Sequence, residues 1–160
     1  MNYLFTSDSE NETFGLGIKI GELLSGGEFI ALSGELGAGK TYFTKGIVKG
    51  LGANPEEVVS PTFTLINEYP GKLKIYHADF YRIVSSSDVE STGIWEHLDD
   101  ESGVVIVEWA DKFKDILPED RLDVQIVSLS EEKREIIISA FDDKHSEIIK
   151  KIIDASKNIK

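Results

Sequence analysis

The residues best suited to chemistry lie at positions 34–41, where the chain reads Gly-Glu-Leu-Gly-Ala-Gly-Lys-Thr. This run matches the pattern G-x-x-x-x-G-K-[ST]. Glycines let successive backbone N–H groups turn toward phosphate oxygens, the lysine supplies a cation for the β- and γ-phosphates, and the threonine hydroxyl can bind Mg²⁺. The sequence therefore predicts a site for ATP or a related triphosphate with Mg²⁺. The binding residues that we expect here are Gly37, Ala38, Gly39, Lys40 and Thr41.

Two carboxylates are expected to complete this site. A glycine-rich phosphate loop needs a further acidic residue directed at Mg²⁺, at the carboxyl end of a neighbouring strand. Asp79 follows the run Lys-Ile-Tyr-His-Ala, and Glu108 follows the apolar residues 104–107. Both carboxylates would face the crevice where α/β proteins bind ligands. We predict that Asp79 and Glu108 are metal ligands and, with Lys40, catalytic residues; which of the two carboxylates acts on the attacking water stays open.

Several further residues near these motifs call for an interpretation. The run Ser-Pro-Thr-Phe-Thr at residues 60–64 lies where P-loop proteins carry a switch loop, and we expect Thr62 to sense the γ-phosphate through Mg²⁺. His77 alternates with apolar residues and is interpreted as structural. Trp109 is interpreted as a packing residue. Arg82 could stabilise charge in a transition state, but a salt bridge is the favoured interpretation.

Strand and helix patterns alternate along the chain and predict the elements that position these residues. Such alternation indicates an α/β fold of the P-loop NTPase type, with a mixed central sheet flanked by helices, in one domain over residues 1–160. Strands are expected at residues 3–6, 28–33, 62–69, 74–78, 104–107, 122–129 and 135–140. Helices are expected at residues 10–24, 41–51 and 144–159, with a short helix and loop at 85–98.

Composition limits the possible functions. The chain has 17 Lys and Arg against 29 Asp and Glu, a formal net charge of −12, and no cysteine. Disulfides and cysteine chemistry are excluded, and a strongly acidic chain is poorly suited to binding nucleic acid by itself. The charge favours solubility, or else a surface that docks on a basic protein. Without a long apolar run or a basic leader, we expect no membrane contact and a cytoplasmic location.

Four sequence segments together resemble the bacterial TsaE family, also called YjeE. They are the loop at residues 34–41, Ser-Pro-Thr-Phe-Thr-Leu-Ile-Asn-Glu-Tyr at 60–69, Tyr-His-Ala-Asp-Phe-Tyr-Arg at 76–82, and Val-Glu-Trp at 107–109. The first segment is common to many P-loop proteins. The second and third, in this order and spacing, are specific to the family.

The resemblance implies a slow ATPase that uses ATP and Mg²⁺ and assists the synthesis of threonylcarbamoyladenosine in tRNA. It implies the TsaD and TsaB proteins as partners, with tRNA contacted only indirectly. It assigns Lys40 and Thr41 to phosphate and metal, and Thr62 to the switch. It also implies that adenine lies near the first helix, which makes Glu10 a binding candidate. Tyr42 stands where the family commonly has a second threonine that can touch the α-phosphate. Tyrosine keeps a hydroxyl but is bulkier, and we expect Tyr42 at the nucleotide.

Two other functions fit the sequence less well. A small-molecule kinase would need an arginine-rich lid over its acceptor, and residues 85–98 contain no arginine or lysine. A GTP-controlled switch would be expected to carry an Asn-Lys-x-Asp-like run for guanine, and the chain has none. The first discriminating observation is whether the protein phosphorylates an added acceptor or only releases phosphate.

Overall fold

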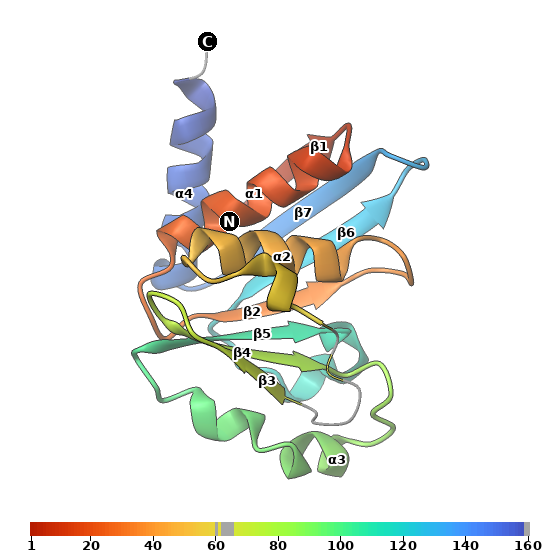
Figure 1. Ribbon diagram of the computed structural model, residues 1–160, viewed down its shortest axis with the longest axis vertical. Coiled ribbons are helices and arrows are strands. Elements are labelled where there is room, and N and C mark those ends of the chain that lie inside the picture. Colours follow the sequence, from red (N-terminus) through yellow and green to blue (C-terminus); the bar gives the residue numbers. More distant parts are fainter. Residues whose placement is uncertain (60, 62–65, 159–160) are drawn as a thin grey trace.

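The computed structural model describes residues 1–59, 61 and 66–158, in which strands alternate with helices except at the consecutive pairs β3–β4 and β6–β7 (Figure 1). The strands are β1 (Asn2–Ser7), β2 (Phe29–Ser33), β3 (Ile66–Tyr69), β4 (Lys74–Asp79), β5 (Gly103–Glu108), β6 (Leu122–Ser128) and β7 (Arg134–Ala140). The α-helices are α1 (Glu10–Leu23), α2 (Lys40–Gly50), α3 (Ser86–Ser91) and α4 (Asp143–Lys157). Short 3₁₀ helices are η1 (Pro55–Glu57), η2 (Ile94–His97) and η3 (Ala110–Ile116).

The strands form one seven-stranded sheet in the order β1-β7-β6-β2-β5-β4-β3. The four central strands β6, β2, β5 and β4 run parallel, whereas β3, β7 and β1 pair antiparallel with their neighbours. Every residue of β5 is buried, as expected for a parallel strand that is covered on both faces. The mixed sheet predicted from the sequence is thereby confirmed.

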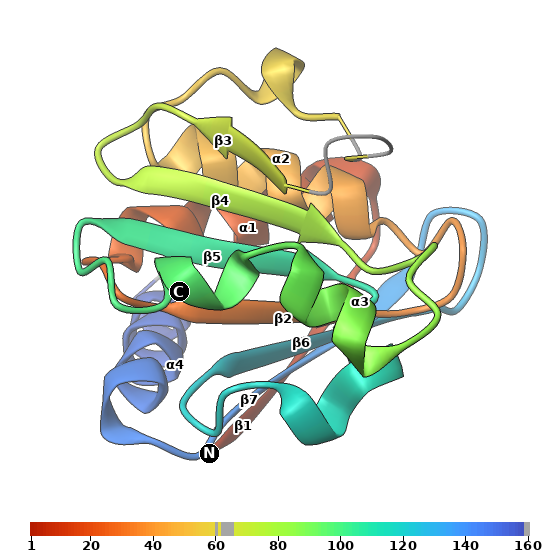
Figure 2. The ribbon, with the colours of Figure 1, turned by 90° about the horizontal axis from the view of Figure 1, so that it is seen from below.

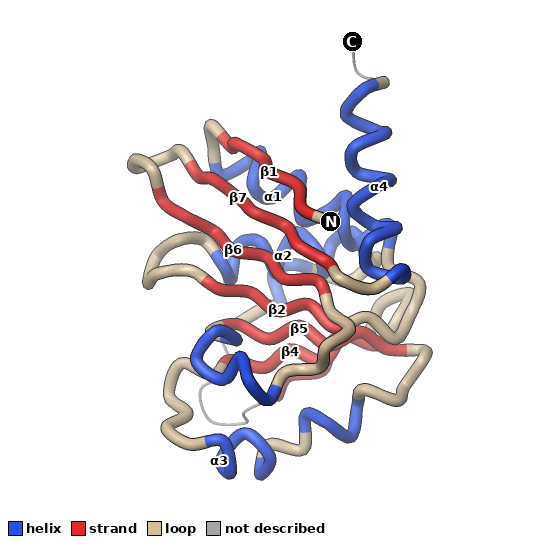
Figure 3. Tube along the Cα trace, turned by 180° about the vertical axis from the view of Figure 1, so that it is seen from behind, coloured by secondary structure: helices blue, strands red, loops and turns tan. Residues whose placement is uncertain are grey.

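Two apolar cores lie on opposite faces of this sheet because successive strand residues point to opposite sides. In β2, Ile30 and Leu32 join the core beneath α1, α2 and α4, while Phe29 and Ala31 join the core beneath η2, η3 and α3. Figure 2 shows α1 and α2 on one side of the sheet and η3 on the other. Seen from behind, β7 and β6 run uncovered along much of their length among the described residues (Figure 3).

Glycines allow α1 and α2 to approach very closely. A Cβ atom built on Gly21 would lie 2.3 Å from the carbonyl oxygen of Ile47, and one built on Gly46 would lie 2.4 Å from the carbonyl oxygen of Phe14. No real side chain tolerates such distances without a shift of the backbone. The close packing of α1 on α2 therefore depends on these glycines. It fixes the position of α2, and α2 begins at Lys40, directly after the last glycine of the loop.

The predicted elements are found with small differences at their ends. The helix expected at residues 10–24 ends at Leu23, and the one expected from residue 41 begins at Lys40. The strand expected at residues 62–69 is seen from Ile66, because residues 62–65 lie outside the described residues. The 3₁₀ helices η1 and η3 were not predicted. Among the described residues, no helix combines the length and apolar character needed to cross a membrane.

Candidate nucleotide-binding site

The glycine-rich loop joins the carboxyl end of β2 to the first residue of α2. Gly37 has a φ of 79° and Gly39 a φ of 108°, both in the left-handed region that favours glycine. A Cβ atom built on either glycine would meet nothing within 4 Å, so this side of the loop is open. Gly39 also precedes the N-terminus of α2, where backbone N–H groups lack partners within the helix. The loop thus offers a cradle and a helix end to an anion.

The Lys40 side chain lies inside the loop. Its Nζ atom donates hydrogen bonds of 2.6 Å to the carbonyl oxygen of Gly34 and of 2.9 Å to that of Glu35. The same Nζ lies 3.9 Å from the centroid of the Trp109 ring, an attractive cation–π contact. Only 5% of the residue is exposed. Its ammonium group is therefore positioned at the loop by contacts on two sides.

Thr41 and Glu108 are joined directly. The Thr41 hydroxyl donates a 2.8 Å hydrogen bond to Oε1 of Glu108. Glu108 ends β5, and its register partner on the parallel strand β4 is Asp79, which ends that strand. Asp79 Oδ1 in turn accepts a 2.9 Å hydrogen bond from the backbone N–H of Tyr81. The two predicted carboxylates therefore lie side by side at the carboxyl edge of the sheet, and one of them contacts the loop threonine.

The charges of this site influence one another. Burial raises the pKa of Asp79, and the nearby Glu108 carboxylate raises it further, while the hydrogen bond from the Tyr81 N–H acts in the opposite direction. Burial lowers the pKa of Lys40, against the opposing influence of Glu108, Asp111 and Asp79. Two carboxylates held together in a partly buried place favour a bound cation, since a cation offsets their mutual repulsion.

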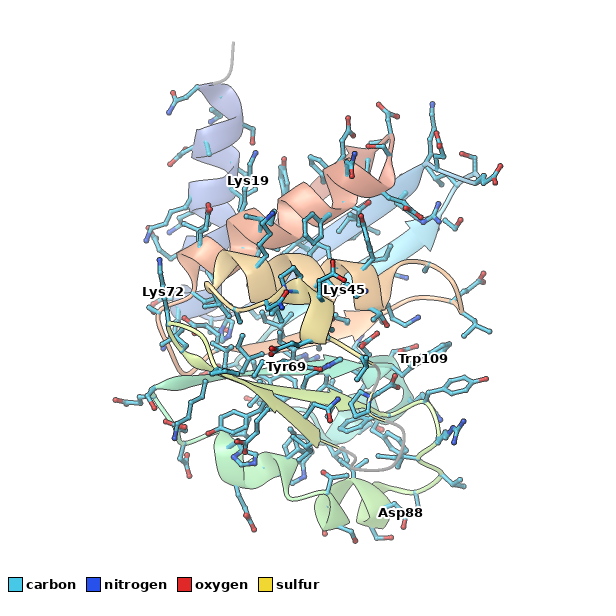
Figure 4. All side chains as sticks on the ribbon, in the orientation of Figure 1. Lys19, Lys45, Tyr69, Lys72, Asp88 and Trp109 are labelled. Atoms are coloured by element: carbon cyan, nitrogen blue, oxygen red, sulfur yellow. The ribbon has the colours of Figure 1, made fainter. Side chains whose placement is uncertain are left out.

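A cavity of about 390 Å³ opens between the loop and the ends of β4 and β5. Most of the predicted site residues line it. Its walls are Leu36, Gly37, Gly39, Lys40, Thr41, Tyr42, Pro61, Asp79, Tyr81, Arg82, Ile83, Glu108 and Trp109. Figure 4 shows Trp109 beside the carboxyl end of β5. The segment after β4 is held in place by Lys112 of η3, whose Nζ donates to the carbonyl oxygens of Tyr81 and Ile83 at 2.6 and 2.9 Å.

Two of the predicted residues line a second, smaller hollow instead. Glu10 and Ala38 line a hollow of about 60 Å³ on the other side of the loop, and Tyr42 borders both cavities. The Tyr42 ring packs against Phe14 of α1 at 5.3 Å between centroids. Arg134 Nε donates to the carbonyl oxygen of Ala38 at 2.9 Å and closes one side. Thr62 lies outside the described residues.

The donor atoms of the site suit Mg²⁺. The described residues contain no cluster of three or more His, Cys, Asp or Glu side chains that could bind a metal ion without other ligands. Mg²⁺ is a hard cation that keeps several waters and is usually bound by one or two carboxylates plus substrate phosphates. The Thr41 hydroxyl and the carboxylates of Glu108 and Asp79 are oxygen donors of this kind, and they line the cavity together with the glycine-rich loop.

Sequence reasoning missed two features of this site. His77 Nε2 lies 2.5 Å from Glu108 Oε2, so the residue interpreted as structural contacts a candidate catalytic carboxylate. The period of two in a strand places His77 on the same face as Asp79, and this signal was available in the sequence. Trp109 has a φ of 58°, which is rare outside glycine and turns its ring toward Lys40. The salt bridge expected for Arg82 is not found with any described residue.

The fold and the site define an α/β protein with a mixed seven-stranded sheet, in which a strand, a glycine-rich loop and a helix meet two carboxylates. Residues 7–136 match the family model described as "Threonylcarbamoyl adenosine biosynthesis protein TsaE". The chain belongs to the TsaE family.

Similar proteins agree with this assignment. The chain is 39% identical over 133 residues to the tRNA threonylcarbamoyladenosine biosynthesis protein TsaE of Treponema pallidum, covering 83% of this chain and 97% of that protein. It is 39% identical over 153 residues to the protein of the same name from Nostoc, covering 93% and 92%. The crystal structure of YdiB from Bacillus subtilis is 30% identical and superposes with a TM-score of 0.80, covering 98% of this chain and 97% of that one.

Proposed function

We propose that this chain is a Mg²⁺-dependent ATPase of the P-loop NTPase class that assists TsaB and TsaD in forming the threonylcarbamoyl modification of adenosine in tRNA. It acts on the protein complex and not directly on tRNA. The observation that carries the proposal is the 2.8 Å hydrogen bond between Thr41 Oγ1 and Glu108 Oε1 beside an open glycine cradle. It joins the expected metal-binding hydroxyl to the expected acidic partner. Membership of the TsaE family supports the role in tRNA modification.

In this proposal the loop binds the triphosphate. Backbone N–H groups around Gly37 and Gly39 and the N-terminus of α2 receive the phosphate oxygens. The Lys40 ammonium exchanges its bonds with the loop carbonyls of Gly34 and Glu35 for bonds with phosphate oxygens. Tyr42, between the two cavities, borders the nucleoside, and Glu10 lies near the base.

Glu108 and Asp79 act on the water that attacks the γ-phosphate. Mg²⁺ bound to the triphosphate would neutralise developing charge on the phosphates. The Thr41 hydroxyl, the Glu108 carboxylate and the Asp79 carboxylate would hold the ion and its waters. A carboxylate at this edge of the sheet can also orient a water or accept its proton. Either of the two carboxylates can take this role.

Exposed apolar side chains around the cavity support a protein partner. Leu36 of the loop is 77% exposed and Val84, one residue beyond the cavity wall, is 89% exposed. Two more large apolar residues are exposed nearby. Tyr81 lines the cavity, and Val59 lies two residues before Pro61, which also lines it. An apolar rim next to a polar site is typical of a protein contact surface. A partner seated there would exclude water from the nucleotide.

The test is a steady-state phosphate-release assay of the purified protein with Mg²⁺-ATP, alone and with the TsaB–TsaD pair. Slow release alone and faster release with the pair are expected. Transfer of phosphate to an added small molecule would instead support the kinase alternative. Fast release that ignores the pair would contradict the role proposed for the partners.

A further inference from the structure

A chain of buried polar contacts leads from Glu108 away from the nucleotide cavity. Oε2 of Glu108 lies 2.5 Å from Nε2 of His77, and Nδ1 of His77 lies 3.2 Å from the hydroxyl of Tyr69. The Tyr69 hydroxyl contacts the backbone of Val59 at both polar atoms, 3.4 Å from its N and 3.3 Å from its O. Three side-chain contacts therefore link a candidate catalytic carboxylate to a main-chain position 49 residues earlier in the sequence.

The proton positions give this chain a direction. A carboxylate accepts, so Nε2 of His77 donates to Glu108, and Nδ1 of His77 accepts where it carries no proton. The single proton of the Tyr69 hydroxyl can go either to the carbonyl oxygen of Val59 or to that nitrogen. In the second arrangement the Tyr69 oxygen accepts from the Val59 N–H, and the Val59 carbonyl oxygen accepts from Asn67 Nδ2. Burial raises the pKa of Tyr69, which keeps the hydroxyl protonated. With this tautomer, each group donates toward Glu108.

The chain is enclosed except at its far end. His77 is fully buried, Glu108 is 1% exposed and Tyr69 is 6% exposed, whereas Val59 is largely exposed. Tyr69, labelled in Figure 4, comes from β3, His77 from β4 and Glu108 from β5. Asn67 steadies the outer end, because its Nδ2 donates to the carbonyl oxygen of Val59 at 3.1 Å. Val59 directly precedes the segment beginning at Ser60, which the sequence singled out as a switch motif and which lies almost wholly outside the described residues.

We propose that Tyr69 and His77 are positioning residues that couple the Glu108 carboxylate to the backbone at Val59. Both oxygens of Glu108 are engaged, Oε1 by the Thr41 hydroxyl and Oε2 by His77. A shift of the carboxylate as Mg²⁺-ATP binds must therefore change the His77 contact, and with it the Tyr69 contact to Val59. This inference rests on the proposed function, because it needs a nucleotide that acts on Glu108.

The test compares variants that break the chain at different places. Tyr69→Phe removes the hydroxyl and keeps the ring in the core. Tyr76→Phe is the matched control: Tyr76 lies on the adjacent strand, is 5% exposed, and its hydroxyl donates to Asp100 Oδ2, away from the cavity. His77→Gln places an amide nitrogen near the original Nε2 and loses the contact with Tyr69, whereas His77→Ala loses both.

The measurement is amide hydrogen exchange at Val59, with and without Mg²⁺-ATP, together with ATP affinity and kcat. Wild type and Tyr76→Phe should show a nucleotide-dependent change in exchange of about two- to tenfold, the range expected for one hydrogen bond. Tyr69→Phe should lose this response while retaining ATP affinity, with kcat reduced. His77→Gln should have a higher kcat than His77→Ala. Neither variant should show the nucleotide-dependent change in hydrogen exchange at Val59.

The possible failures are distinguishable. Equal nucleotide responses in wild type and Tyr69→Phe, or no response in a wild-type protein that does bind and hydrolyse ATP, would overturn the coupling and leave the proposed function standing. A wild-type protein that does not bind Mg²⁺-ATP at all would overturn both. Equal loss in Tyr76→Phe and Tyr69→Phe would assign the effect to general destabilisation and overturn the coupling.

Discussion

Asp79 and Glu108 are register partners at the carboxyl ends of the parallel strands β4 and β5. Parallel neighbours end at the same edge of the sheet, and the register of β4 and β5 sets these two residues opposite each other. The two carboxylates therefore lie next to each other, and that of Glu108 accepts the hydrogen bond from Thr41. The two acids are therefore not equivalent: Glu108 is connected to the loop and to His77, and Asp79 is connected to the backbone of Tyr81.

Glu108→Gln and Asp79→Asn are expected to lower ATP hydrolysis more than ATP binding. Groups that orient water or stabilise developing charge act mainly in the transition state. We expect kcat, measured with partners present, to fall at least about tenfold for each variant, which corresponds to about 1.4 kcal/mol. Wild-type turnover in both variants would show that the carboxylates have been misassigned.

Lys40→Ala and Thr41→Ala are expected to weaken Mg²⁺-ATP binding. The first removes the cation of the loop and the second a metal-directed hydroxyl, so we expect the Kd from calorimetry to rise at least about tenfold, or about 1.4 kcal/mol. Lys45→Ala, also on α2 and outside the cavity walls, is the matched control and should bind like wild type. Unchanged affinity in both site variants would remove the basis for a nucleotide at this loop.

Much of the fold was predictable because local and tertiary preferences agree. The continuous apolar runs of β2 and β5, the Pro-Gly turn before β4 and the glycine-rich loop before α2 each specify one structure. The segment at η3 was missed because Ala110–Ile116 is mixed in polarity and even contains a non-helical residue, Phe113. Its placement is decided by tertiary contacts, such as the packing of Phe113 on Phe80.

The site was predictable in part, for a different physical reason. Residues of the loop and the acids at strand ends carry their signal in residue type and spacing. Alternation within β4 places His77 and Asp79 on one face, but the contact between His77 and Glu108 also depends on the register of β4 against β5, which no local pattern contains. The left-handed backbone at Trp109 is likewise invisible in the sequence, because it is an unusual conformation imposed by the surroundings.

Gly21→Ala is expected to destabilise the protein, whereas Gly15→Ala on the same helix is expected to stabilise it. The new Cβ at position 21 would lie 2.3 Å from the Ile47 carbonyl oxygen, while one at position 15 would meet nothing within 4 Å. Overpacking costs about 1–3 kcal/mol, and replacing a helical glycine by alanine gains about 0.5–1 kcal/mol. Urea denaturation measures both changes. Similar free energies of unfolding for the two variants would contradict the close packing of α1 on α2.

Asp100 is expected to support stability near neutral pH and to lose this effect in acid. Hydrogen bonds from the Ser102 hydroxyl, the Tyr76 hydroxyl and the Ser102 N–H lower the pKa of Asp100 from 3.8 to about 2. A lowered pKa in the folded state stabilises the protein above the ordinary pKa, and the effect disappears as the pH falls through 3.8 toward 2. The Tm difference between wild type and Asp100→Asn should therefore shrink over this range. Asp99→Asn is the control, and a constant difference down to low pH would refute the assignment.

The protein alone is expected to hydrolyse ATP slowly and to become competent on its partner complex. The described residues supply a glycine-rich loop and two carboxylates, while the cavity is open and bordered by exposed Leu36 and Val84. A partner that covers this rim would exclude water and could add a cation in trans, as activators do for P-loop proteins. We expect the TsaB–TsaD pair to raise phosphate release at least about tenfold, far below the largest effects known for such activators.

The surface dependence of this stimulation can be tested with one pair of variants and a salt series. Val84→Asp should lose stimulation and keep slow hydrolysis, because it places a charge on the apolar rim without altering the cavity walls. Leu129→Asp, at an exposed apolar residue after β6, should respond like wild type. The net charge of −12 favours docking on a basic face, so stimulation should weaken as ionic strength rises. If the pair still stimulates phosphate release by Val84→Asp, and if this stimulation does not change with ionic strength, the partner does not bind at this rim.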